Sequence, residues 1–208
     1  MGPVKRSLKP AAADDRNRQS RGATRRQKIL DAAVELFASR GYRNTGIMTL
    51  AARVGMSDTG LLYYFGSKER LLQEVVAERP PVRFPVSTPE LSLTQLRDLG
   101  RRYASQRTLT RLYLVLAAES LGEDEPLHEF FLRRYRHGIE FLEAVLENDR
   151  SRGSIRADVD VAQIAVEILA TEFGLELMWL MDPEIDIASI RANHIDHLVE
   201  DLGPRPGG

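Results

Sequence analysis

Residues 41–72 read GYRNTGIMTLAARVGMSDTGLLYYFGSKERLL, and they predict two short helices joined by a tight turn. Apolar residues recur at helical spacing in the first helix: Ile47, Leu50, Ala51 and Val54. Gly55 then suits the left-handed residue of the turn, and Ser57 is a good N-cap for the second helix. A helix, a short turn containing Gly and a second helix form the helix-turn-helix pattern, whose second helix enters the major groove of DNA.

The flanking sequence predicts one helix before this unit and another after it. Thr24–Gln27 forms a T-x-x-Q capping box, and Gly41 ends the helix that it opens. The apolar residues of this helix share one face: Ile29, Ala32, Ala33, Leu36 and Phe37. Ser67 caps a fourth helix, which Pro80 and Pro81 stop. We therefore predict a DNA-binding domain over residues 23–80, with the helix-turn-helix at about 46–65.

The same stretch resembles the DNA-binding domain of TetR-type (tetracycline-repressor-like) transcriptional regulators. The positions that carry the resemblance are Gly41-Tyr42, Thr45, Leu50-Ala51, Gly55-Met56-Ser57, Leu61, Tyr64-Phe65, Ser67-Lys68-Glu69 and Leu71-Leu72. The sequence departs from the family at Thr59-Gly60, where Gly-Thr is frequent, at Leu62, where Tyr is frequent, and at Met48, where Arg is frequent. The resemblance implies a dimeric repressor that binds a palindromic operator in double-stranded DNA and is released by a small-molecule ligand.

The resemblance also implies which residues contact DNA. Four residues of the recognition helix match positions that face base edges: Asp58, Thr59, Gly60 and Tyr63. Three residues match phosphate contacts: Thr45, through its hydroxyl or its backbone, Tyr64 and Lys68. Gly60 permits a close approach of the helix to the groove. Asp58 could accept a hydrogen bond from a cytosine amino group, or it could equally serve the helix N-terminus, where negative charge is favourable.

From Leu91 onward the pattern is helical again, and no segment alternates with period two over a useful length. The sequence predicts helices over 93–106, 108–121, 126–151, 160–181 and 186–202. Pro126 should lie in the first turn of the third of these, and Asp160 should cap the fourth. We therefore predict an all-α fold of about nine helices, with a ligand-binding and dimerisation domain over residues 88–203.

The predicted helix over 160–181 is apolar on nearly all sides. A helix of this kind must be buried all round, and in a chain of 208 residues a second subunit is the simplest cover for one side. TetR-like proteins dimerise through their last two helices, which pack with their mates as a four-helix bundle. The sequence thus predicts a homodimer through these helices. The alternative is a central helix in a monomeric core.

TetR-like regulators hold a small ligand among the helices of the second domain, in a pocket with apolar walls and a few polar anchors. The candidates for such a pocket are Tyr113, Glu119, Phe131, Tyr135, Glu172, Phe173 and Trp179. The aromatic residues are also ordinary core residues, and salt bridges to arginine would explain the two glutamates equally well. The effector remains unknown from sequence.

Charge is divided unevenly along the chain. Residues 1–70 hold 14 Lys and Arg against 6 Asp and Glu, whereas residues 71–208 hold 15 against 24. A basic first third is what a polyanion-binding head on a separate body would show, although a chance distribution of solvated charge gives the same count. Residues 1–22 are predicted to form a disordered basic tail, which either reaches DNA or only aids solubility.

The composition excludes several other classes of protein. The absence of Cys excludes a disulfide framework, a thiolate metal site and a cysteine nucleophile. No long apolar run and no secretory signal are present, so we expect a cytoplasmic protein without a membrane partner. Without a G-x-S-x-G, phosphate-loop or H-E-x-x-H motif, we expect no enzyme, no cofactor and no metal site. The alternatives are a constitutive DNA-binding regulator without a ligand and, from another class, a helical enzyme acting on a small apolar substrate.

Overall fold

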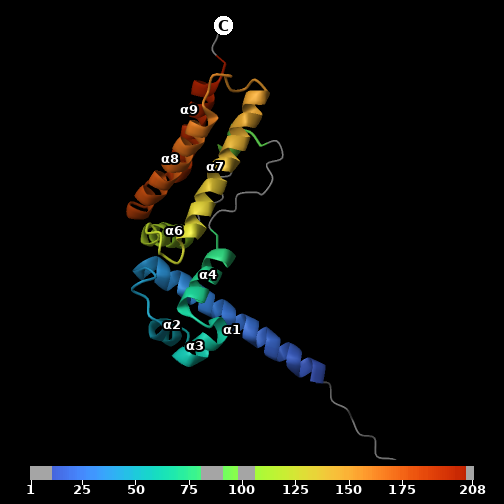
Figure 1. Cartoon of the computed structure of the whole chain (residues 1–208), viewed down its shortest axis with the longest axis vertical. Coiled ribbons are helices and arrows are strands. Elements are labelled where there is room, and N and C mark those ends of the chain that lie inside the picture. Colours follow the sequence, from blue (N-terminus) through green and yellow to red (C-terminus); the bar gives the residue numbers. More distant parts are fainter. Residues whose placement is uncertain (1–10, 81–90, 98–105, 205–208) are drawn as a thin grey trace, which may run out of the picture.

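The computed structural model describes residues 11–80, 91–97 and 106–204, with side chains from residue 22 onward, and every element within these ranges is a helix (Figure 1). The elements with defined bounds are α1 (Ala11–Arg40), α2 (Ile47–Arg53), α3 (Asp58–Phe65), α4 (Lys68–Glu78), α6 (Arg107–Glu119), α7 (His128–Ser151), α8 (Val161–Met181) and α9 (Ile187–Leu202). Residues 93–97 are also helical, which agrees with the start of the helix predicted over 93–106, and residues 98–105 lie outside the described ranges. The predicted all-α fold is confirmed.

Helices α1 to α4 form a unit that we call the head. Its centre consists of side chains without exposed surface, among them Phe37, Leu50, Leu61 and Val75. The same cluster continues into α6 and the start of α7 through Leu112, Leu116 and Phe131. Figure 1 shows α6 lying between the head and the near ends of α7 and α8. The head is therefore packed directly onto the next helices rather than held by a linker alone.

The first helix differs from the sequence prediction. It begins at Ala11 and not at Thr24, so residues 11–22 extend α1 instead of belonging to a disordered tail. Residues 1–10 lie outside the described ranges. The physical reason is that the stretch 11–21 is rich in Ala and Arg, which are good helix formers. Once the buried part of α1 has nucleated the helix, each added residue gains a hydrogen bond at little further cost.

Helices α6 to α9 form a second unit that we call the body. Its core joins α7, α8 and α9 through Leu142, Val145, Ala165 and Ile195. The predicted start of the long helix needs a correction, because Pro126 lies in a turn and α7 begins at His128. The N-cap prediction for α8 is correct, since the Asp160 carboxylate accepts hydrogen bonds from the backbone N–H groups of Ala162 and Gln163.

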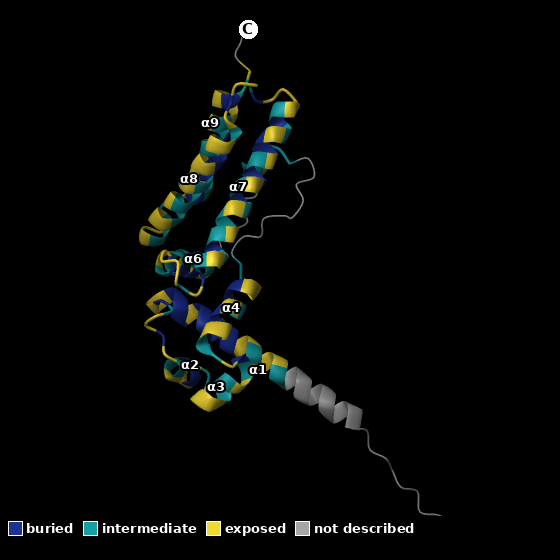
Figure 2. Cartoon of the chain, in the orientation of Figure 1, coloured by how far each residue is buried: buried dark blue, intermediate teal, exposed yellow. Residues whose placement is uncertain are grey.

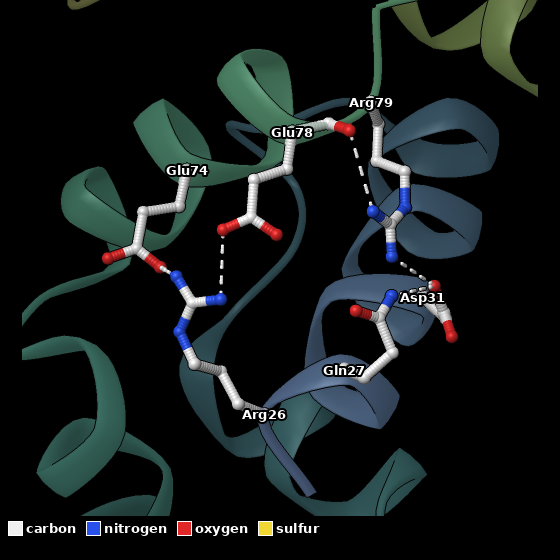
Figure 3. A network of polar contacts seen from close by, with 6 residues as sticks. All are labelled: Arg26, Gln27, Asp31, Glu74, Glu78 and Arg79. Carbon is white, nitrogen blue, oxygen red and sulfur yellow. Dashed lines mark hydrogen bonds and ion pairs between the residues drawn. The ribbon is translucent and has the colours of Figure 1, made fainter. Parts of the chain in front are cut away.

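Polar contacts fasten α4 to α1 on the outside of the head (Figure 3). Arg26 of α1 is ion-paired with both Glu74 and Glu78 of α4, with 2.9 Å between Nη1 and the Glu78 carboxylate. Arg79, at the end of α4, donates to Asp31 of α1 at 3.0 Å. These side chains are partly exposed, so each pair contributes at most about 1 kcal/mol. They join α4 to α1 at both the middle and the end of α4.

Candidate nucleic-acid interface

The helix-turn-helix forms as the sequence predicts. The turn passes through Gly55, whose φ of 65° lies in the left-handed region. The Ser57 hydroxyl accepts a hydrogen bond from the backbone N–H of Gly60 at 3.1 Å and so caps α3. Leu61 and Phe65 turn into the core of the head. The opposite face of α3 is therefore left at the surface.

That surface carries most of the residues that the sequence assigns to base edges. Asp58 and Thr59 are exposed at the N-terminus of α3, and Tyr63 is 88% exposed. The Tyr64 ring is half-buried and lies edge-on to Tyr63, with 6.0 Å between the ring centroids. A Cβ at Gly60 would come within 3.1 Å of the Ser57 hydroxyl oxygen. Gly60 thus leaves space for the Ser57 cap, and it adds no side chain to this part of the helix surface.

The Asp58 carboxylate is directed to its own helix. Its Oδ1 accepts a hydrogen bond from the backbone N–H of Thr59 at 2.8 Å. A carboxylate is favourable there, because the first N–H groups of a helix lack backbone partners and carry partial positive charge. Of the two roles considered from sequence, the helix-terminus role is the one that this geometry provides.

Thr45 requires a correction, because its side chain is completely buried and cannot reach a phosphate. Its hydroxyl donates to the backbone carbonyl of Gly41 at 2.7 Å. The chain between α1 and α2 folds back on itself here, and a threonine satisfies the buried carbonyl that results. Thr45 therefore shapes this connection. The sequence pattern could not show this, since a threonine before a helix is equally suited to an exposed cap.

Lys68 stands at the first residue of α4, where Ser67 caps the helix by accepting from the backbone N–H of Arg70. Its ammonium lies over the ring of Tyr42, with 4.0 Å between Nζ and the ring centroid. Partial burial lowers the pKa of Lys68, and the nearby Glu119 carboxylate acts in the opposite direction. The position combines a side-chain cation with the free N–H groups of a helix N-terminus, which is a favourable arrangement for an anion.

The residues assigned to the effector pocket do not all meet. Tyr113, Phe131, Tyr135 and Phe173 form a continuous row of aromatic rings, with successive centroids 5.9, 6.0 and 5.0 Å apart. Trp179 is elsewhere on α8, and the guanidinium carbon of Arg107 lies 5.7 Å from its ring centroid. Of the residues predicted to line a pocket, only these four aromatic rings lie in one continuous row.

The two glutamates proposed for that pocket have structural partners. Glu119 lies at the junction of body and head, where its carboxylate accepts from the backbone N–H of Tyr42 at 2.7 Å, so its assignment to the pocket is wrong. Glu172 accepts from Nε of Arg191 at 2.6 Å, as the salt-bridge alternative expected.

Sequence reasoning did not single out Arg191 or Glu176, which form a polar cluster with Glu172. Glu176 accepts from Nη2 of Arg191 at 3.1 Å, so one buried guanidinium joins two carboxylates of α8. Burial raises the pKa of Glu176, and Arg191 counteracts this. Arg134, whose pKa burial lowers, lies 4.9 Å over the ring of Tyr113. The available signal was the spacing of Glu172 and Glu176, which places both on one helix face.

Exposed residues lie along α8 and α9 (Figure 2), and several of them are large and apolar. The large apolar side chains exposed on this surface are Val166, Leu177, Met178 and Met181 of α8 and Ile190 of α9. Ala162, Ala170 and Gly174 are also exposed on α8, at the four-residue spacing that places them in line with Val166. We call this surface the α8–α9 face. Several large apolar side chains exposed along one side of a helix are unusual on the surface of a monomer.

Two further findings bear on the class of protein. No helix in the described ranges is long and apolar enough to cross a membrane. Among those same residues, no cluster of three His, Asp or Glu side chains could hold a metal ion.

Known proteins share both the motif and the fold. Residues 29–75 match the family described as bacterial regulatory proteins, tetR family. The HTH-type transcriptional regulator LmrA of Bacillus subtilis (strain 168) is 30% identical over 132 residues, covering 58% of this chain and 70% of LmrA. The HTH-type transcriptional repressor KstR2 of Rhodococcus jostii (strain RHA1) is 27% identical over 183 residues, covering 83% of this chain and 86% of KstR2. The solved SmeT–triclosan complex is similar with a TM-score of 0.69 and 20% identity, over 88% of this chain and 93% of that chain.

A capped recognition helix on a basic head, together with these relatives, defines a DNA-binding transcriptional regulator. The chain belongs to the tetR family of bacterial regulatory proteins. Membership also agrees with the expectation that the protein is not an enzyme, because regulators of this family act as DNA-binding transcription factors.

Proposed function

We propose that this protein is a homodimeric repressor that binds a palindromic operator and leaves it when a small apolar ligand enters the body. The observation that carries the proposal is the surface of α3, where Asp58, Thr59 and Tyr63 are exposed beside a capped helix N-terminus. Two such heads related by a twofold axis would read two half-sites in opposite directions, which is why a palindrome is expected.

The α8–α9 face supports the homodimer. It is apolar, and its small residues Ala162, Ala170 and Gly174 would allow a second pair of helices to approach closely. A Cβ at Gly174 would meet no atom of the same chain within 4 Å, so the space beside it is open in one subunit. Packing against a second copy would bury this surface and make the four-helix arrangement expected from the sequence.

The ligand part of the proposal rests on the aromatic row from Tyr113 to Phe173. Rings in edge-to-face contact form walls that suit a flat apolar molecule. The similar SmeT structure was solved with triclosan, which is an aromatic ligand, and this supports the same class of effector for the present chain. The partly buried Arg134 beside Tyr113 would provide a polar group at one end of the row.

Replacement of Lys68 by alanine tests the DNA-binding part. The operator is first selected from random duplex DNA, and binding is then titrated at several salt concentrations. We expect Lys68→Ala to weaken operator binding about tenfold, and to reduce the slope of log K against log salt by about 1, because one phosphate contact is lost.

The matched control is Arg136→Ala, which removes one positive charge from an exposed site on α7 in the body. It should leave both the affinity and the slope unchanged. If the folded wild-type protein enriches no sequence at low salt, the proposed function is wrong. If Lys68→Ala behaves like Arg136→Ala, the phosphate role of Lys68 is wrong.

A further inference from the structure

A carboxylate of the body is bound to the backbone of the head at one turn. Glu119 is the last residue of α6, and its Oε2 accepts a hydrogen bond from the backbone N–H of Tyr42 at 2.7 Å. The neighbouring Gly41 has a φ of 80°, and a Cβ there would overlap Oε1 of Glu119. The turn between α1 and α2 is therefore shaped around this side chain.

The position of Glu119 is electrostatically unfavourable for its own helix. The C-terminal end of α6 carries the partial negative charge of unpaired carbonyls, and a carboxylate is disfavoured there. It is also a negative charge close to a surface that binds DNA. Because the carboxylate of Glu119 does not stabilise α6, the interactions that offset these two costs must lie across the junction with the head. The structure supplies one as the hydrogen bond from the Tyr42 N–H.

Tyr42 connects this junction to the DNA-facing side of the head. Its ring packs edge-on against the buried Phe37, with centroids 5.6 Å apart, and holds the Lys68 ammonium at 4.0 Å. A displacement of the Tyr42 backbone would therefore move the ring on which Lys68 rests. Glu119, Tyr42 and Lys68 thus form a continuous series of contacts from the end of α6 to the start of α4.

The opposite end of α6 is fixed to the body. Arg107, its first residue, donates through Nη2 to the backbone carbonyl of Leu180 in the last turn of α8, at 2.8 Å. Its guanidinium carbon also lies 5.7 Å from the Trp179 ring centroid. With one end bound to α8 and the other to the Tyr42 backbone, α6 gives Glu119 a fixed reference in the body.

We propose that Glu119 is a positioning residue for operator binding: its hydrogen bond to the Tyr42 backbone holds Tyr42, and through it Lys68, in the place from which Lys68 contacts phosphate. The proposal rests on the proposed function, since it concerns the affinity for an operator. It differs from the pocket role that the sequence suggested for Glu119, and it requires no ligand. The property that matters is the reach of the side chain to Tyr42 N, and not its charge.

Two substitutions separate reach from charge. Glu119→Gln keeps the length and an acceptor oxygen but removes the charge, whereas Glu119→Asp keeps the charge but is one methylene too short. We expect Glu119→Gln to bind the selected operator within about threefold of wild type, and Glu119→Asp to bind about tenfold more weakly, the factor that corresponds to losing one hydrogen bond. Glu123→Gln, in the exposed loop after α6, controls for removal of a nearby negative charge.

The decisive readout is the same pair of substitutions in a Lys68→Ala background. If Glu119 acts through Lys68, the difference between Gln and Asp disappears there, and Glu119→Asp alone reduces the salt slope as Lys68→Ala does. A merely structural role would give the same loss in both backgrounds. Circular dichroism melting establishes that each variant is folded, and if Glu119→Asp does not fold, Gly41→Ala displaces the carboxylate from the other side and should reproduce its effect on the slope.

The outcomes distinguish this proposal from the proposed function. If wild type binds an operator and the Gln and Asp variants bind it equally well, or if the weaker one is Gln, the positioning role is overturned while the regulator stands. If wild type binds no operator, the proposed function has failed first.

Discussion

Replacing Leu177 by glutamate should convert the protein from a dimer into a monomer and weaken operator binding at least about 100-fold. Leu177 is 53% exposed in a single chain and lies on the α8–α9 face. In a twofold dimer the substitution places two carboxylates in one apolar interface, and burying unpaired charges costs several kcal/mol. A monomer holds one half-site at a time and loses the advantage of a second, tethered head.

Sedimentation velocity measures the mass change, and titration of the selected operator measures the loss of affinity. Leu121→Glu is the matched control, because Leu121 is 81% exposed in the loop after α6 and away from the α8–α9 face. It should leave the protein dimeric. A Leu177→Glu protein that sediments as a dimer would show that another surface forms the interface, and the proposed arrangement would be wrong.

Local signals predicted most of the fold correctly because they act within one turn of the chain. Ser57, Ser67 and Asp160 each accept a hydrogen bond from a backbone N–H two or three residues onward, so their effect is visible in sequence. Gly55 is similar, since a left-handed residue is a property of one position. These few positions mark where α3, α4 and α8 begin and where the turn after α2 lies.

Contacts between distant segments could not be predicted in the same way. Glu119 and Tyr42 are 77 residues apart, and nothing near either residue indicates their hydrogen bond. Thr45 is buried because α1 and α2 close over it, which its neighbours in sequence do not encode. The start of α1 was predicted too late because the local sequence at Thr24 matches a capping box. In the structure the helix continues through Thr24 and begins at Ala11. Sequence reasoning therefore predicted α3 and its cap, missed the contacts at the junction, and leaves the assigned base contacts as predictions.

Replacing Arg191 by methionine should lower the free energy of unfolding by about 3 kcal/mol at pH 7. Arg191 is 7% exposed and is the shared partner of Glu172 and Glu176. Methionine fills a similar volume without charge, so two carboxylates one helical turn apart lose the cation between them. Breaking a buried pair costs about 3–5 kcal/mol, and the lower value applies because both carboxylates keep part of their surface in water.

The stability that Arg191→Met loses should become smaller as the pH falls toward 4.5, the ordinary pKa of Glu176. Burial already raises the pKa of Glu176 in the folded protein, and removing Arg191 raises it further. A carboxyl group with a raised folded pKa contributes its stability fully below the unfolded pKa and loses it as the pH rises through the folded pKa. The variant is therefore destabilised most at neutral pH, and its stability recovers as Glu176 takes up a proton at lower pH.

Urea unfolding at pH 7 and pH 5 measures this difference, at one protein concentration because a dimer's stability depends on it. Arg133→Met is the matched control: Arg133 pairs with Glu129 on the surface of α7, and both side chains are mostly exposed. Such a pair contributes at most about 0.5 kcal/mol at either pH. Equal losses for the two variants would mean that the Arg191 cluster is no more stabilising than a surface pair. If Arg191→Met lowers the free energy of unfolding as much at pH 5 as at pH 7, then Arg191 stabilises the protein through packing and not through its charge.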